Sequence, residues 1–320
     1  MSLEQWENKA RAFAQRLTAL LGPVPDVPSV MRDECINVSR VGRLTVEERN
    51  VWWGQERIPL LVLYDDAGRA PRSAVICIHG HHGNRYVLAG LANTTEDEER
   101  IRRFGYDYAR QLAEAGFLTV AYDLRGFGER PFALNPKGHD PCDMEFLRLM
   151  LTGRTLLGLH VWDLRRVIDY LETRPDVRPG AIGCVGFSLG GTIALYGGAL
   201  DRRLKAVGVF SALNHYTHYA IGAGHFCGAQ VVPGLLPEAD LPDVASLIAP
   251  RALWIEHGDA DETFSVNDAL LSIEEVAQAY RRQGVGDQLG THVFHGGHRF
   301  ELGESAAFFK RVLGEGREGS

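Results

Sequence analysis

The strongest chemical pattern in this 320-residue chain is a serine at a glycine-rich turn. The turn, Gly186-Phe187-Ser188-Leu189-Gly190, follows the apolar run Ile182 to Phe187 and precedes a stretch of small and apolar residues. Such a run is typical of a strand buried on both faces, and the stretch after it is typical of a buried helix. A serine between a strand and a helix is held in strained backbone geometry, with its hydroxyl lifted clear of the sheet. The five-residue pattern alone recurs by chance, so this context is what identifies Ser188 as a candidate nucleophile.

A serine hydroxyl is a weak nucleophile at neutral pH, and it needs a base within hydrogen-bond reach and a carboxylate that orients the base. Both should follow strands, because ligands bind beyond the carboxyl ends of parallel strands. Asp261 follows the strand-like run ALWIEH, and His298 follows THVF. The order serine, acid, histidine is also the order found with this type of turn. We therefore expect Asp261 as the acid and His298 as the base.

Other residues compete for both roles. The alternatives are Asp259, Glu256 and Glu262 for the acid and His295 for the base. Glu256 lies within its strand and Asp259 directly follows the turn glycine, so Asp261 is preferred and Asp259 is the second choice. Gly296-Gly297 favours His298 over His295, because two glycines let the loop reach back over the nucleophile.

Two backbone N–H groups are expected to hold the oxyanion of an acyl-transfer reaction. The start of the helix after Ser188 supplies one. The glycine-rich loop His79-Gly80-His81-His82-Gly83-Asn84, which follows a central strand-like run, can supply the other. The alternative for the three histidines is a metal site, but zinc needs convergent ligands, and the adjacent His81 and His82 do not easily converge. We therefore prefer the oxyanion role and predict no metal ligand.

The elements that position these residues alternate between strand and helix. The strand-like runs are Ser73 to His79, Phe117 to Asp123, Ile182 to Phe187, Leu204 to Phe210, Pro250 to His257 and Thr291 to Phe294. Two earlier runs, Leu44 to Trp53 and Ile58 to Tyr64, are typical of an antiparallel hairpin at a sheet edge. The pattern predicts an α/β fold with a mostly parallel central sheet, helices on both faces and an antiparallel N-terminal edge.

One large domain with insertions is the simplest organisation. We expect a helical N-terminal extension over 1–40 that packs on the core, a single domain over 41–313 and a disordered tail over 314–320. The connections at about 130–157 and 211–243 are long for a compact domain, which suggests that they cover a substrate. Within them, His215, His218 and His225 are candidates for a pocket lining, although packing or surface roles are the simpler expectation for each. Arg125 and Arg130 are expected to hold their loop by salt bridges.

Composition excludes several functional classes. The chain has 45% hydrophobic and 23% charged residues, a net charge of −7 and a pI near 6.0, so neither nucleic acid nor an anionic membrane is expected as a partner. The first residues carry no apolar leader segment and no stretch is long enough to span a membrane, so a cytoplasmic location is predicted. The five cysteines are scattered, and Cys77 and Cys184 lie in strand-like runs, so buried thiols are expected in place of disulfides or metal ligands.

Taken together, GFSLGG, HGHHG, DLRGFGER, HGDAD and GGHRF resemble the motifs of the α/β-hydrolase superfamily. The segment ADLPDVASLIAPRALWIEHGDADETF with GGHRF is similar to bacterial hydrolases of the dienelactone-hydrolase and acetyl-xylan-esterase-like group, over roughly residues 45–312. The resemblance implies Asp261 as acid, His298 as base, and the backbone N–H groups of Leu189 and His81 as oxyanion donors. The chain departs from dienelactone hydrolases, which use a cysteine nucleophile. It also has Arg125-Gly126-Phe127 where the cephalosporin-deacetylase branch has R-G-Q.

The chemistry implied is a serine carboxylesterase acting on short-chain or acetyl-type esters through an acyl-enzyme. No cofactor is expected, the partner is a small-molecule ester, and an oligomer is possible. The alternatives are a peptidase of the prolyl-oligopeptidase-like type and a non-catalytic protein on a hydrolase fold. Only about 70 residues precede the first central strand, too few for the large N-terminal domain of such peptidases, and all three triad members are present.

Overall fold

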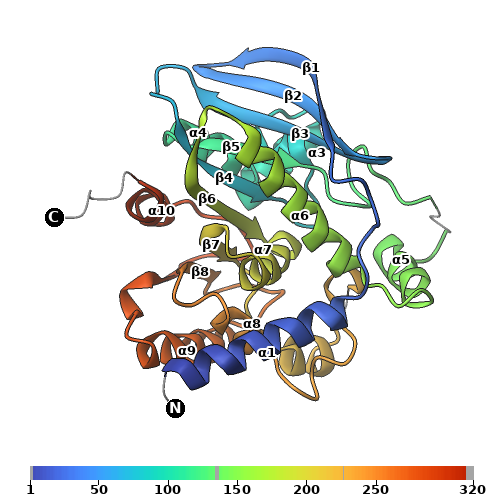
Figure 1. Cartoon of the computed structure of the whole chain (residues 1–320), viewed down its shortest axis with the longest axis vertical. Coiled ribbons are helices and arrows are strands. Elements are labelled where there is room, and N and C mark those ends of the chain that lie inside the picture. The colour runs from blue at the N-terminus through green and yellow to red at the C-terminus, as the bar shows by residue number, and fades with distance from the viewer. Residues whose placement is uncertain (1–2, 134–136, 226, 315–320) are drawn as a thin grey trace.

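A nine-stranded sheet forms the centre of the molecule (Figure 1). The computed structural model describes residues 3–133, 137–225 and 227–314. The strands are β1 (Met31–Val41), β2 (Leu44–Trp53), β3 (Glu56–Asp65), β4 (Arg72–Ile78), β5 (Leu118–Tyr122), β6 (Val177–Phe187), β7 (Leu204–Phe210), β8 (Ala252–Gly258) and β9 (Leu289–Phe294). Their order in the sheet is β1-β2-β3-β5-β4-β6-β7-β8-β9. The six strands β5, β4, β6, β7, β8 and β9 are parallel to one another, whereas β1, β2 and β3 pair antiparallel at one edge. The predicted fold class is confirmed.

Helices cover both faces of this sheet. They are α1 (Leu3–Leu21), α2 (Arg85–Leu88), α3 (Thr95–Phe104), α4 (Tyr108–Glu114), α5 (Pro141–Met150), α6 (Leu156–Thr173), α7 (Leu189–Leu200), α8 (Leu241–Ser246), α9 (Val266–Arg282) and α10 (Ser305–Leu313), with short turns of other helix types at η1 (Thr217–Gly222), η2 (Gly228–Gln230) and η3 (Gly286–Gln288). Helices α6, α7, α8 and α9 share one hydrophobic core with the sheet, and α2, α4 and α10 share another on the opposite face.

Strand β4 shows why the central runs are apolar throughout. Ala74, Ile76 and Ile78 enter the core with α6 and α7, whereas Val75 and Cys77 enter the core with α4 and α10. Successive side chains of a strand point to opposite faces, so a strand covered on both sides needs an apolar residue at every position.

The strand register brings four loops to one edge of the sheet. Ile78 at the end of β4 lies opposite Gly186, and Phe187 at the end of β6 lies opposite Phe210. Near the sheet edge formed by β9, Gly258 at the end of β8 lies opposite Phe294 at the end of β9. The loops after β4, β6, β8 and β9, which carry the predicted site residues, therefore all begin at the carboxyl edge.

The N-terminal part differs from its prediction. We expected a helical extension over 1–40, but β1, which begins at Met31, pairs with β2 along almost its whole length and makes the sheet edge. Helix α1 is present, and its Leu17 and Leu21 are buried in the core. The division into an extension over 1–40 and a domain over 41–313 stays a prediction. Of the predicted tail, residues 315–320 lie outside the described residues, as do 134–136 in the first insertion.

The insertions contain short helices. The first includes α5, and the second is mainly irregular, with η1, η2 and the start of α8. Within the described part of the chain, no helix is long and apolar enough to cross a lipid bilayer. The cytoplasmic location stays a prediction.

Candidate active site

Ser188 occupies a strained turn between β6 and α7. Its φ of 56° and ψ of −122° are unusual for a residue other than glycine. Its N–H donates to the carbonyl oxygen of Phe210 at 2.9 Å, and its own carbonyl accepts from the N–H of Thr192 at 3.0 Å. The strain is thus held by the neighbouring strand and the first turn of the helix.

The two glycines of the turn are required by close backbone packing. A Cβ at Gly186 would overlap the carbonyl oxygen of Gly190, and a Cβ at Gly190 would overlap the carbonyl oxygen of Ile78 at the end of β4. The sequence pattern around Ser188 is therefore explained by the geometry of the turn.

Asp261 and His298 lie together at the same edge. The Nδ1 atom of His298 is 2.8 Å from Oδ2 of Asp261, and Oδ1 of Asp261 accepts the N–H groups of Thr263 at 2.8 Å and Phe264 at 2.9 Å. Burial alone would raise the pKa of Asp261, but the hydrogen bond and charge of His298 and the backbone N–H of Phe264 hold it below its usual value. Asp261 is therefore built to stay ionised and to orient the imidazole.

His298 is fixed between two aromatic rings. Its ring centroid is 4.6 Å from that of Phe187, the residue before the nucleophile, and 5.7 Å from that of Phe264. A Cβ at Gly258 would overlap the carbonyl oxygens of Gly296 and Gly297, so the loop before His298 packs directly on the end of β8. Within the described residues, no hydrogen bond joins the Ser188 hydroxyl to His298; such catalytic bonds often form only when substrate is bound.

The competing residues form contacts of their own. His295 Nδ1 lies 3.0 Å from Asp259 Oδ2, but the His295 side chain is 96% exposed. Glu256 is buried and accepts from Trp254 Nε1 and from the N–H of Glu301, both at 3.2 Å. Burial raises the pKa of Glu256 to about 8. Of these, the geometry favours Asp261 with His298, because the Asp261 carboxylate is buried and the His298 ring packs on Phe187 of the nucleophile turn.

Glu262, the remaining candidate for the acid, is exposed.

The expected oxyanion donors lie on the two sides of Ser188. Leu189 is fully buried at the first position of α7, where backbone N–H groups have no partner within the helix. On the other side, a Cβ at Gly80 would lie 3.2 Å from the Cβ of Ser188, so the glycine before His81 packs against the nucleophile. The roles of the Leu189 and His81 N–H groups stay predictions.

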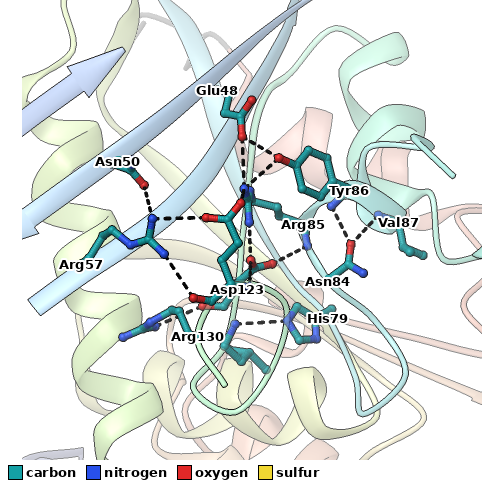
Figure 2. A network of polar contacts seen from close by, with 12 residues as sticks. Glu48, Asn50, Arg57, His79, Asn84, Arg85, Tyr86, Val87, Asp123 and Arg130 are labelled. Atoms are coloured by element: carbon teal, nitrogen blue, oxygen red, sulfur yellow. Dashed lines mark hydrogen bonds and ion pairs between the residues drawn. The ribbon is translucent and has the colours of Figure 1, made fainter. Parts of the chain in front are cut away.

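A buried polar network anchors this loop after β4 (Figure 2). His79 Nε2 accepts the N–H of Leu124 at 3.2 Å, and desolvation lowers the pKa of His79 to about 4, which keeps the ring neutral. Arg85 donates its backbone N–H to Asp123 Oδ1 at 2.8 Å, and its guanidinium is paired with Asp123, Glu48 and Glu129. The network ties the end of β4 to the end of β5.

Sequence reasoning did not single out Arg85 or Asp123. The available signals were that Asp123 begins the motif DLRGFGER and that Arg85 directly follows the loop His79 to Asn84.

Arg125 and Arg130 both pair with a buried carboxylate on α6. Arg125 Nη2 is 2.8 Å from Asp163 Oδ1, and Arg130 Nη1 is 2.7 Å from Asp163 Oδ2. The predicted salt bridges are confirmed, and their acceptor, Asp163, is a residue that sequence reasoning had not identified.

The histidines of the second insertion have separate environments. His215 Nδ1 is 2.9 Å from Asp268 Oδ1 and 3.1 Å from Ser272 Oγ. A second triad is not formed, because base and orienting contacts need opposite ring nitrogens and these two partners share one. His218 and His225 are exposed.

The histidines after β4 do not converge on a common point. His79 is buried and His82 exposed, whereas His81 Nε2 lies 2.8 Å from Cys227 Sγ, with Cys142 nearby. The cysteine prediction is confirmed for Cys77 and Cys184, which are buried free thiols.

A groove of about 620 Å³ lies elsewhere, between α1 and helices α8 and α9. Its lining includes Trp6, Phe13 and Leu247 and none of the triad residues. It is therefore not assigned to the substrate.

The family model of the alpha/beta hydrolase fold matches residues 73–216, which include β4, the motif loop after it and the nucleophile turn. The chain has the α/β-hydrolase fold. A curated relative, "Putative hydrolase YtaP" of Bacillus subtilis, is 28% identical over 239 residues, covering 73% of this chain and 75% of the relative. With the Asp261–His298 pair beside the Ser188 turn, these matches confirm the prediction of a hydrolase-type enzyme.

Two solved structures are similar in fold. One is a putative acetyl xylan esterase from Bacteroides fragilis, with a TM-score of 0.75 and 20% identity, covering 92% of this chain and 76% of the other. The second is a glucuronoyl esterase from Solibacter usitatus, with a TM-score of 0.74 and 17% identity, covering 98% and 95%. At these identities, the similarity shows the fold alone.

Proposed function

We propose that this α/β-hydrolase is a serine carboxylesterase for short-chain, acetyl-type esters, with Ser188, His298 and Asp261 as its catalytic triad. The observation that carries the proposal is the His298–Asp261 pair, with 2.8 Å between Nδ1 and Oδ2, a buried Asp261 carboxylate, and a half-buried His298 ring that packs on the residue preceding Ser188. Because Nδ1 of His298 bonds to Asp261, Nε2 is the ring nitrogen that can act as the base.

The reaction divides into two similar halves. The hydroxyl oxygen of Ser188 attacks the ester carbonyl while Nε2 of His298 takes the hydroxyl proton. His298 then gives this proton to the departing alcohol oxygen. Water attacks the acyl-serine by the same route, releases the acid and restores the serine. Asp261 accepts the Nδ1–H bond throughout and stabilises the imidazolium.

The oxyanion is assigned to the backbone N–H groups of Leu189 and His81. Each such donor is typically worth about 100- to 1,000-fold in rate, because it is already aimed at the charge that develops. No cofactor is required for this route.

The ester class is supported by the fold neighbours, whose names are those of carboxylic ester hydrolases. Both names refer to carbohydrate substrates, so acetylated xylan and a methyl ester of glucuronic acid are natural test compounds beside simple esters. The substrate is expected to be a small molecule, and an oligomer remains compatible with the proposal.

The test is hydrolysis of p-nitrophenyl acetate, butyrate and octanoate by the wild-type protein and by Ser188→Ala. We expect acetate and butyrate to be cleaved faster than octanoate, and the variant to lose the activity while it keeps the wild-type melting temperature. A proline-linked peptide amide is run in parallel. Cleavage of the amide and not of the esters would favour the peptidase alternative, and no turnover of any substrate would favour a non-catalytic protein.

A further inference from the structure

A second cluster of reactive side chains lies beside the loop after β4. Three atoms, one from each of His81, Cys142 and Cys227, lie within 4.8 Å of one another. The closest contact is the 2.8 Å between His81 Nε2 and Cys227 Sγ. These residues are far apart in the sequence and come from the motif loop and from the two insertions.

Local structure holds the two cysteines in place. Cys142 is near the start of α5, where the cap residue Asp140 accepts the N–H of Cys142 at 2.8 Å. The N–H of Gly228 donates to Asp143 Oδ1 at 2.7 Å, which seats the Cys227 segment on the same helix. A Cβ at Gly228 would lie 2.9 Å from the carbonyl oxygen of Cys142, so this close approach requires glycine.

We propose that His81, Cys142 and Cys227 bind one zinc ion. Two cysteine sulfurs and one imidazole nitrogen are preferred zinc ligands, and thiolates select zinc over hard cations such as magnesium. In a tetrahedral zinc site, ligand atoms lie roughly 3.5 Å apart. To surround one ion, the 2.8 Å contact between His81 Nε2 and Cys227 Sγ has to open slightly, and any wider separation, 4.8 Å at most, has to shorten by about 1 Å.

Two further features suit a cation. The carboxylates of Asp140 and Asp143 act on His81 as nearby negative charges. With three protein ligands among the described residues, a water molecule would complete the tetrahedron.

A disulfide between Cys142 and Cys227 is the competing use of the same residues. It would leave the His81 imidazole without a function, although the structure directs its Nε2 at Cys227. The zinc proposal uses all three groups, and it joins the insertions at 130–157 and 211–243 to the loop that packs on Ser188.

The proposal is tested by metal binding to the full chain, reduced with a phosphine and stripped with a chelator. We expect one Co²⁺ per chain with a thiolate-to-cobalt charge-transfer band, and displacement of this band by Zn²⁺. Cys142→Ser and Cys227→Ser should each abolish the band or weaken binding by about 100-fold or more, whereas Cys35→Ser, at an exposed position on β1, should bind as the wild type does. A band that survives in Cys227→Ser, or no binding, would overturn the proposal.

A measurement on the wild-type chain covers the case in which a variant does not fold. Zinc should slow alkylation of Cys227 at least tenfold, as measured by mass spectrometry of its peptide, while the rate at exposed Cys35 in the same molecule is unchanged. It should also raise the melting temperature by about 5 °C, since a ligand that binds only the folded state stabilises it. Equal alkylation rates with and without zinc, or a Cys142–Cys227 disulfide in place of bound metal, would contradict the zinc site.

Discussion

The ring of His298 packs on that of Phe187, with centroids 4.6 Å apart, so the predicted base rests on the residue that precedes the predicted nucleophile. The same ring is hydrogen-bonded through Nδ1 to Asp261. Base, acid and nucleophile turn are therefore positioned by direct contact between three strand-end loops.

Asp261→Asn should lower kcat for p-nitrophenyl acetate by about 1,000- to 10,000-fold, with a small change in KM, because the imidazole loses the carboxylate that orients and stabilises it. Asp259→Asn is the matched control, since Asp259 pairs with the exposed His295, and it should retain activity within about threefold. If Asp259→Asn were the more damaging variant, the assignment of the acid would be wrong.

Gly190→Ala should destabilise the fold by about 3 kcal/mol, because the new Cβ meets the backbone of Ile78 and neither the end of β4 nor the first turn of α7 can move freely. Gly286→Ala is a suitable control, as its Cβ would lie 3.7 Å from Arg281 Cγ, an ordinary contact. Denaturant unfolding measures both. A Gly190→Ala chain as stable as the wild type would refute the packing argument for the nucleophile turn.

Asp163→Asn should lower the free energy of unfolding at pH 7 by about 3–5 kcal/mol, because two largely buried guanidinium groups lose the negative charge that they share. Burial raises the pKa of Asp163, but the charges of Arg130 and Arg125 outweigh this and hold it below its usual value. The stabilisation is therefore present above the usual aspartate range and is lost as the pH falls, so the deficit of the variant should narrow in acid.

Asp169→Asn, on the same helix α6, removes a more exposed pairing and should cost at most about 1 kcal/mol. An equal effect of the two variants on unfolding would contradict the special role of Asp163.

Glu256 should make the protein less stable in alkali. Its pKa is raised by burial from 4.5 to about 8, so folding favours the protonated acid. This contribution is full below the ordinary pKa and is lost as the pH rises through about 8. Glu256→Gln should remove this loss and be more stable than the wild type at pH 9 by on the order of 2 kcal/mol.

Glu262→Gln, at an exposed position in the following loop, should leave the pH dependence of the melting temperature unchanged. A wild-type pH profile in Glu256→Gln would show that the buried carboxyl does not titrate in this range.

The sequence predicted those parts of the fold that are buried on both faces. The runs of β4, β6, β7 and β8 are apolar because both faces of the sheet are covered there, and an unbroken apolar run can be recognised in the sequence without any tertiary information. Strand β1 was not predicted, because nearly all its residues are exposed and its sequence therefore has no hydrophobic pattern. Its position comes from pairing with β2, which is a tertiary contact.

The candidate site shows the same division. Ser188, Asp261 and His298 lie in glycine-bearing motifs whose local geometry the residues themselves require. The approach of Cys227 to His81 depends instead on how the insertions pack, with Gly228 held by Asp143 on α5. Residues that far apart carry no spacing pattern, so their meeting could not be predicted.

The most direct test of the central claim is covalent labelling with a fluorophosphonate, followed by peptide mapping. A serine activated by His298 should react to about one label per chain, with the label on Ser188 and none in Ser188→Ala. Ser272→Ala is the control, because Ser272 also lies beside a histidine–aspartate pair, His215 and Asp268, and this variant should label as the wild type does. A label on any other serine, or an unlabelled wild-type chain, would contradict the assignment of Ser188 as the nucleophile.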